Sequence, residues 1–442
     1  MTRERAMLLN ARFDRSLVNV GGESVRYLVI TARAPDIEVE SSTPREPLNL
    51  AMVIDASGSM SGAPLEAAKT ATIGVADSLL ESDRLSIVSF ASDVQLHIDA
   101  VRTDESGRRQ VTDAVRRLVT RGSTNLAEGW LKGCECVARE LANAGVRGRN
   151  HVILLSDGHA NQGELNPQVL EKHAHELRDR GVLTSTVGVG VNYSPVQLQA
   201  IAEAGGGRMH DAERPEEIIE VVLAELNETL RTSVENLEVD VAFPEGVRVD
   251  LYGSAPSSQT AGRLTAVLGS MVAGSTRRLV IKLTLPAGAA GKSLAIEMSA
   301  RWKWPGDPAV QQSGPRKLEL TYASASACTQ QPRDPETARI VAEQWQSHVI
   351  RQAMILNQDG EYQRARGYAE QQLKWFERYC EGLLGAESMI ELMRRFAPSV
   401  EVQYSMSSSK EMMLRAHKSS RGEADHRSSR RGDYGSFIPP QR

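Results

Sequence analysis

The chain has 442 residues, a length that corresponds to about three domains of ordinary size. Its 52 Lys and Arg residues against 56 Asp and Glu residues give a net charge of −4, which excludes the strongly basic balance of a nucleic-acid-binding protein. Hydrophobic residues make up 41% and charged residues 24% of the chain, so wholesale disorder is excluded and each domain can bury a core.

The lack of an apolar targeting segment and the small number of cysteines predict a cytoplasmic protein without a membrane span. The first ten residues carry a charge every few positions and contain no apolar signal-peptide segment, and no later stretch approaches ~18 uninterrupted apolar residues. The 4 cysteines are too few for a disulfide scaffold and have no Cys-x-x-Cys spacing. These features favour a reducing compartment, and we expect the cytoplasm.

Residues 1–47 are expected to supply strands to a β-sandwich. From Ser24 to Ala34, hydrophobic and β-branched residues occupy alternate positions, as in a strand with one buried face. So few strands cannot form a stable sheet alone. We therefore expect this segment to pair with strands that follow much later in the chain.

Residues 48–231 alternate buried strands with amphipathic helices. The expected strands are nearly continuous apolar runs: Leu48–Ile54, Leu85–Phe90, Val152–Leu155 and Leu183–Val191. The expected helices between and after them are Pro64–Leu80, Glu105–Leu118, Leu126–Asn143, Asn166–Arg180, Pro195–Ala204 and Pro215–Leu230. Strands that are apolar on both faces, alternating with helices, predict an α/β domain with a doubly wound, mostly parallel, Rossmann-like sheet.

Residues 232–323 return to the strand pattern. Six alternating runs are separated by Pro, Gly and Ser clusters: Leu237–Phe243, Val247–Leu251, Leu264–Leu268, Leu279–Leu285, Leu294–Trp302 and Lys317–Tyr322. This spacing predicts an antiparallel sandwich. With residues 1–47 as its first strands, the α/β domain becomes an insertion in a β-sandwich.

The last part of the chain is predicted to contain a small helical domain and a tail. Residues 334–398 begin with a helix start, Asp334 followed by Pro335, and continue with hydrophobic residues at helical spacing. Residues 406–442 contain eight Lys or Arg residues, four Asp or Glu residues and few large apolar side chains. We expect this segment to be a disordered, locally basic tail.

A group of oxygen donors follows the first buried strand. Asp55, Ser57 and Ser59 stand at alternate positions in a turn that Gly58 makes sterically accessible. In a doubly wound fold, ligands bind at the carboxyl ends of the strands, which is where this turn lies. Carboxylate and hydroxyl oxygens are hard ligands that suit Mg²⁺ or Mn²⁺.

Two more donors are expected at the same edge of the sheet. Thr124 opens a predicted helix, and Asp157 ends the strand that begins near Val152. An isolated Asp55-x-Ser57 would be better explained as a cap of the following turn. The additional presence of Thr124 and Asp157 favours a metal site instead.

Together, Asp55-x-Ser57-x-Ser59, Thr124 and Asp157 resemble the metal-ion-dependent adhesion site of the von Willebrand factor type A family. The resemblance covers roughly Leu48–Arg231. It implies that Ser57, Ser59 and Thr124 bind the metal directly and that Asp55 and Asp157 support it with charge. The order of the segments resembles that of bacterial von Willebrand A proteins and, more distantly, of inter-alpha-trypsin-inhibitor heavy chains.

The resemblance implies a binding protein rather than an enzyme. A metal held by two carboxylates and neutral hydroxyls remains an electrophile, so a partner protein can add an Asp or Glu carboxylate at the open position. Relatives of this kind act as scaffolds, sometimes beside ATPases or kinases. The alternative is a metal-assisted hydrolase in which the same ion activates water. His159 is the only histidine in the sequence close to a site loop that could serve as its base.

Overall fold

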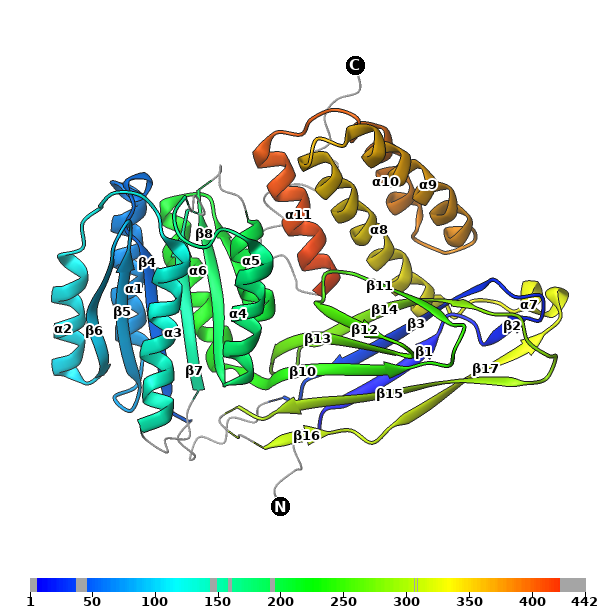
Figure 1. The fold of residues 1–442 in the computed structure, drawn as a ribbon, viewed down its shortest axis with the longest axis horizontal. Coiled ribbons are helices and arrows are strands. Elements are labelled where there is room, and N and C mark those ends of the chain that lie inside the picture. The colour runs from blue at the N-terminus through cyan, green and yellow to red at the C-terminus, as the bar shows by residue number, and fades with distance from the viewer. Residues whose placement is uncertain are drawn as a thin grey trace.

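The described residues form three packed parts: an α/β domain, a β-sandwich and a helical unit (Figure 1). The computed structural model describes residues 6–36, 46–143, 149–157, 161–190, 195–305, 307 and 309–421. The chain leaves the sandwich after Arg33 and returns to it at Thr232. The α/β domain is therefore inserted into the sandwich, and the helical unit follows it.

Six strands among the described residues form the sheet of the α/β domain, in the order β6-β5-β4-β7-β8-β9. They are β4 (Leu48–Asp55), β5 (Arg84–Phe90), β6 (Val94–Arg102), β7 (Arg149–Ser156), β8 (Val182–Val189) and β9 (Gly206–Ala212). The neighbouring pairs are parallel except β5 with β6. The sequence patterns do not predict β6 and β9, because β6 is a mostly exposed edge strand and β9 has glycines and charged residues in place of an apolar run.

Helices cover both faces of this sheet. They are α1 (Ala63–Ser78), α2 (Glu105–Arg116), α3 (Leu126–Asn143), α4 (Pro167–Asp179), α5 (Val196–Ala204) and α6 (Pro215–Leu230), and a short 3₁₀ helix, η1 (Gly58–Met60), follows β4. Side chains of α1, α2 and α6 pack with Met52 on one face, whereas those of α3, α4 and α5 pack with Val53 on the other. The predicted fold class, a doubly wound α/β domain inserted in a β-sandwich, is confirmed.

The sandwich packs two sheets around a common core. Within the described residues, the smaller sheet has the order β1-β3-β14-β11, with β1 (Leu8–Phe13), β3 (Ser24–Arg33), β14 (Thr276–Leu285) and β11 (Arg248–Tyr252). The larger has the order β12-β13-β10-β15-β17-β2, with β16 beside β15. Its strands are β2 (Leu17–Asn19), β10 (Thr232–Ala242), β12 (Ser257–Thr260), β13 (Arg263–Val272), β15 (Ser293–Lys303), β16 (Val310–Gln312) and β17 (Arg316–Ala323).

Strand β3 connects the N-terminal segment to the rest of the sandwich. It pairs with β14 over its whole length, from Ser24 opposite Leu285 to Arg33 opposite Thr276. Ile30 points into the sandwich core, whereas its neighbour Val29 belongs to a second core beneath the helical unit. Alternate residues of β3 are thus buried on both faces, which explains why the segment needs its distant partners.

The helical unit covers the outer face of the smaller sheet (Figure 1). It contains α8 (Pro335–Gln358), α9 (Tyr362–Cys380), α10 (Glu387–Ser399) and α11 (Met406–Arg421), whereas the short α7 (Ala325–Gln330) lies beside β2 at the end of the sandwich. Asp334 caps α8, because its carboxylate accepts a hydrogen bond from the amide of Thr337 at 2.8 Å. The ring centroids of Trp345 on α8 and Tyr27 on β3 are 5.6 Å apart, which anchors the unit to the sheet.

Helix α11 corrects the prediction of a disordered tail from residue 406. Residues Met406–Arg421 are helical, and Met412, Met413 and Ala416 are buried in the core of the helical unit. The prediction is wrong for these residues because a few apolar side chains suffice when a preformed surface receives them. Residues 422–442 lie outside the described part.

In the part of the chain that the structure describes, no helix is both long enough and apolar enough to cross a membrane.

The buried His348 predicts a loss of stability in acid. Its ring stacks on that of Tyr252, with 4.9 Å between the ring centroids, and burial together with the charge of Arg351 lowers its pKa to about 4. In the unfolded chain His348 is protonated as the pH falls below about 6.5, whereas in the folded protein it is protonated only below about pH 4. The free energy of unfolding therefore decreases as the pH drops through this range. His348→Phe keeps the stacking and should reduce this loss by about 2 kcal/mol, measured by urea unfolding at pH 7.5 and 4.5. Parallel losses in both proteins would contradict the prediction.

Candidate functional site

The first donor loop begins where β4 ends. Its fold is fixed locally, because the amide of Ser57 donates to Asp55 Oδ1 at 2.9 Å and the hydroxyls of Ser57 and Ser59 lie 3.0 Å apart. The amide of Ala56 donates to the Phe90 carbonyl of the neighbouring strand at 2.7 Å. Asp55 and Ser57 are buried, whereas Ser59 is exposed. The two hydroxyls of the loop therefore lie between the buried carboxylate of Asp55 and the protein surface.

The loop that carries Thr124 is attached to the first loop through the backbone. The amide of Gly58 donates to the Gly122 carbonyl at 3.2 Å, and the amide of Arg121 donates to the Ala56 carbonyl at 2.6 Å. Gly122 has φ +29°, and a Cβ atom there would lie 2.2 Å from Ser92 Oγ, so only glycine allows this approach. Thr124 is buried, at 2% exposure, at the start of α3.

Asp157 joins the site from the end of β7. Its neighbour Ser156 donates a hydrogen bond from Oγ to Asp55 Oδ2 at 2.7 Å, which ties the ends of β4 and β7 together. Downstream of Asp157, Asn161 Oδ1 accepts from the amide of Thr124 at 3.0 Å, and the Asn161 amide donates to the Thr124 carbonyl at 3.1 Å. The Asp157 and Thr124 loops are thereby held together.

The electrostatics of this edge favour a cation. The pKa of Asp55 is raised to about 6, because burial and the charge of Asp157 together outweigh the hydrogen bonds from Ser156 and Ser57, which act in the opposite direction. Two carboxylates that both lack full hydration and repel each other are stabilised by a positive charge between them. Hydroxyl and carboxylate oxygens are also the donors that a hard divalent cation prefers, so the residues present fit such an ion.

The structure places the five predicted residues in loops at one edge of the sheet, linked by the hydrogen bonds above. Sequence reasoning did not identify Ser156 and Asn161, which brace the loops. Ser156 could have been noticed as a hydroxyl at the buried end of a strand, directly before Asp157. Asn161 gave no comparable signal, because its role depends on contact with Thr124, 37 residues away.

Residues 49–229 match the von Willebrand factor type A domain family. We refer to these matched residues as the von Willebrand factor type A (VWA) domain. A solved von Willebrand factor type A protein from Catenulispora acidiphila superposes with a TM-score of 0.69 at 16% identity and covers 94% of this chain and 98% of that chain. At this identity the likeness shows a shared fold, which includes the parts outside the VWA domain.

The similarity in sequence to known proteins covers only part of the chain. Protein sll0103 from Synechocystis sp. is 32% identical over 207 residues, which are 47% of this chain and 46% of that protein. Inter-alpha-trypsin inhibitor heavy chain H3 from Mesocricetus auratus is 26% identical over 234 residues, which are 52% of this chain and 26% of that protein. The chain thus spans less than half the length of either relative.

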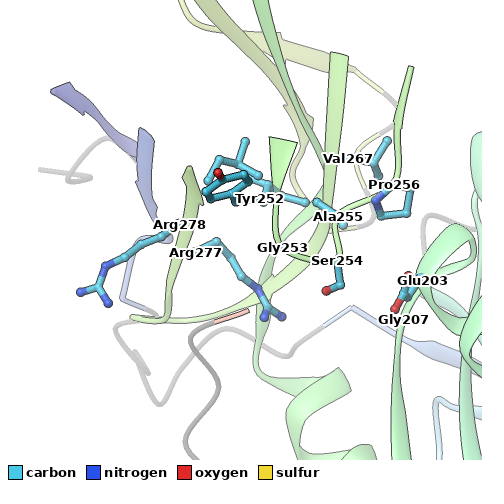
Figure 2. A pocket seen from close by; sticks show the side chains of 13 residues that line it. Glu203, Gly207, Tyr252, Gly253, Ser254, Ala255, Pro256, Val267, Arg277 and Arg278 are labelled. Atoms are coloured by element: carbon cyan, nitrogen blue, oxygen red, sulfur yellow. The ribbon is translucent and has the colours of Figure 1, made fainter. Parts of the chain in front are cut away.

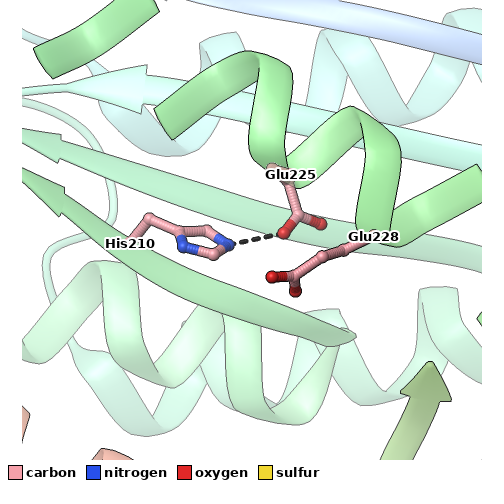
Figure 3. Close-up of side chains that lie close together, drawn as sticks. All are labelled: His210, Glu225 and Glu228. Carbon is pink, nitrogen blue, oxygen red and sulfur yellow. Dashed lines mark hydrogen bonds and ion pairs between the residues drawn. The ribbon is translucent and has the colours of Figure 1, made fainter. Parts of the chain in front are cut away.

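A second polar cluster of the VWA domain lies between β9 and α6 (Figure 3). His210 Nε2 lies 2.5 Å from Glu225 Oε2, and Glu228 lies beside them. Arg208 Nε is 3.0 Å from Glu225 and 2.9 Å from Glu228. Burial alone would raise the pKa of Glu225, but Arg208 and His210 outweigh it and lower the pKa well below its usual value. The guanidinium pairs with both carboxylates and His210 pairs with Glu225, so we assign the cluster to internal ion pairing.

A pocket lies between the VWA domain and the sandwich (Figure 2). Glu203 and Gly207 line it from the VWA domain, and Tyr252, Ser254 and Arg277 are among the residues that line it from the sandwich. Its cavity volume is ≈ 30 Å³, room for about two water molecules. A substrate-sized ligand does not fit this pocket. The candidate functional site is therefore the edge of the sheet that carries Asp55, Thr124 and Asp157.

Proposed function

We propose that this protein is a metal-dependent protein-interaction scaffold. Ser57, Ser59 and Thr124 would hold Mg²⁺ or Mn²⁺, with Asp55 and Asp157 as charged supports. The observation that carries the proposal is the hydrogen bonding of Asp55, which uses one carboxylate oxygen for Ser57 and the other for Ser156. Asp55 thereby orients the loops and supplies charge, and the hydroxyls of Ser57 and Ser59 are left as the forward donors.

The bound ion would supply an electrophilic position for a carboxylate. Neutral hydroxyl donors withdraw little of the ion's charge, so an anionic ligand from outside strengthens the site. An Asp or Glu side chain of a partner protein has this chemistry. A component of an ATPase or kinase system that offers such a side chain is one partner that we propose, although the resemblance does not identify it.

A cytoplasmic location and a non-enzymatic role belong to the same proposal. All four cysteines are free and buried, in keeping with a reducing compartment. The proposed site lies on loops at the edge of the sheet, where a partner surface can reach it, and Ser59 is exposed there. The shortage of candidate bases argues against the hydrolase alternative: His159 is the only histidine in the sequence close to a site loop, and it lies outside the described residues.

Metal binding is tested by removing the two forward hydroxyls. The double variant Ser57→Ala/Ser59→Ala should weaken Mn²⁺ binding about tenfold or more, because two direct ligands are lost. Binding is measured by electron paramagnetic resonance of free Mn²⁺. Ser61→Ala is the matched control, since Ser61 is an exposed hydroxyl just beyond the proposed ligands. Equal Mn²⁺ affinity of the double variant and the wild type would contradict the proposal.

The same sample tests the open position on the metal. The water-proton relaxation enhancement of bound Mn²⁺ should fall when N-acetyl-aspartate methylamide is added, because its carboxylate replaces water on the ion. The matched N-acetyl-asparagine methylamide should have no effect. Metal-dependent turnover of p-nitrophenyl phosphate or of a generic peptide substrate, lost in the double variant, would favour the hydrolase instead.

A further inference from the structure

Helix α11 carries a buried lysine that contacts the VWA domain. The side chain of Lys410 is 1% exposed, and its Nζ atom donates to the Gly190 carbonyl at 2.9 Å and to Asp211 Oδ1 at 3.1 Å. Glu213 Oε1 lies 4.0 Å away. The ammonium group therefore fills an acidic notch, defined here as Gly190, Asp211 and Glu213. Three acidic side chains, Asp211, Glu213 and Glu411, gather here, and Lys410 supplies positive charge among them.

The acidic notch belongs to the same edge of the sheet as the proposed metal site. Gly190 directly follows β8, and Asp211 lies near the end of β9. Strand β8 is parallel to β7, with Gly188 opposite Ser156, the residue before Asp157. Because parallel strands end at the same edge, Lys410 of α11 lies at the ends of β8, the neighbour of the strand that carries Asp157, and of β9, the strand beyond it. Figure 1 shows α11 on the side of the helical unit that faces the VWA domain.

The two sides of α11 make contacts of different kinds. Toward the helical unit, Met412, Met413 and Ala416 are buried in an apolar core, and Ser419 Oγ lies 3.0 Å from Ser347 Oγ. Toward the acidic notch, Lys410 makes an ion pair and a hydrogen bond to a carbonyl. A buried ion pair fixes the relative position of its two groups but contributes little net free energy, because both groups regain hydration when they separate. The contact with the VWA domain is thus the one that can open.

We propose that α11 is a releasable strap: it stays on the helical unit and closes through Lys410 on the edge of β8 and β9, so that strap closure and partner binding at the metal site exclude each other. The covering role rests on the proposed function. The opening of the strap does not, because it depends on the contact between α11 and the acidic notch, in which no metal takes part.

The opening is tested by hydrogen exchange of the full chain in EDTA. Lys410→Met keeps the apolar stem and removes the ammonium, so amides of residues 406–421 should exchange about tenfold faster, with faster exchange also at 186–190 and 206–213. Amides of α8 and α9 should be unaffected, as in the control Lys374→Met on the exposed face of α9. Asp211→Asn removes the other half of the ion pair and should reproduce the pattern if Lys410→Met fails to fold. Unchanged exchange in α11, or equal acceleration in α8 and α9, would overturn the strap.

The covering role is tested with a long poly-L-glutamate chain as a bulky carboxylate probe of the Mn²⁺-loaded protein. Lys410→Met should bind it about threefold more tightly or better, because the wild-type edge is open for only a fraction of the time. Loss of a positive charge by itself would weaken the binding of a polyanion, so a gain reports the uncovered edge. Equal or weaker binding that still requires Ser57 and Ser59 would overturn the covering role. Binding that is independent of Mn²⁺ and of these serines would instead refute the proposed function, and the strap would stand or fall by the exchange result.

Discussion

Replacing Asp55 with asparagine should lower the affinity for Mn²⁺ by about 10- to 100-fold while the metal-free protein stays folded. Asparagine can still accept the hydrogen bond from the amide of Ser57, so the turn is retained. It removes one of the two carboxylates that support the ion, and hence half of the formal charge. The loss is measured by Mn²⁺ titration and the fold by thermal melting in EDTA.

The same substitution should stabilise the metal-free protein above about pH 6. The pKa of Asp55 is raised from 3.8 to about 6 in the folded protein, so folding favours its protonated form. The stability that protonation provides is complete below the ordinary pKa and is lost as the pH rises through about 6. The asparagine side chain carries no charge at any pH, so the melting temperature of Asp55→Asn should exceed that of the wild type at pH 7.5 and approach it at pH 4.

Asp77→Asn provides the control for the loss of one negative charge. Asp77 is exposed on α1, away from the loops of the site, and its replacement should change neither Mn²⁺ affinity nor the pH dependence of melting. Wild-type affinity in Asp55→Asn would place the metal elsewhere. An Asp55→Asn protein that is unfolded in EDTA would show that the carboxylate is a structural requirement.

Replacing Ile30 with alanine should destabilise the sandwich by about 2 to 5 kcal/mol and leave the VWA domain intact. Ile30 is fully buried in the sandwich core, on a strand that lies between β1 and β14. The truncated side chain leaves a cavity at the centre of the smaller sheet. The strands of the VWA domain have their own cores and do not contact this position.

Hydrogen exchange during urea unfolding locates the effect, because a chain with several cores need not unfold in one step. Exchange should accelerate in β3, β14 and β10, and remain as in the wild type in β4 and β7. The adjacent variant Thr31→Ala changes a half-buried position and should stay within about 0.5 kcal/mol of the wild type. Equal acceleration in β4 and β7 would show that the sandwich and the inserted domain unfold as one unit.

The sequence by itself determined strands β4, β5, β7 and β8 and the α-helices of the α/β domain, and it indicated the candidate donors at the edge of the sheet. Runs such as Leu48–Asp55 are apolar on both faces, and only a strand covered by helices on both sides buries them fully. The donors Asp55, Ser57 and Ser59 lie within five residues of one strand end, so their arrangement depends on local geometry that a sequence pattern can carry. The alternating hydrophobic residues of β3 likewise indicated that this strand needs a distant partner, but not which strand that partner is.

Only the tertiary structure decided which distant residues connect the loops of the site and which residue of α11 contacts the ends of β8 and β9. Ser156 reaches Asp55 across 101 residues of sequence, and Lys410 reaches Gly190 across 220. Such contacts depend on how whole helices and strands are placed relative to one another. The spacing of residues along the sequence does not indicate that placement. For the same reason α11 was predicted to be disordered. Its few apolar side chains cannot stabilise an isolated helix, and they do so only against the surfaces that the helical unit and the VWA domain provide together.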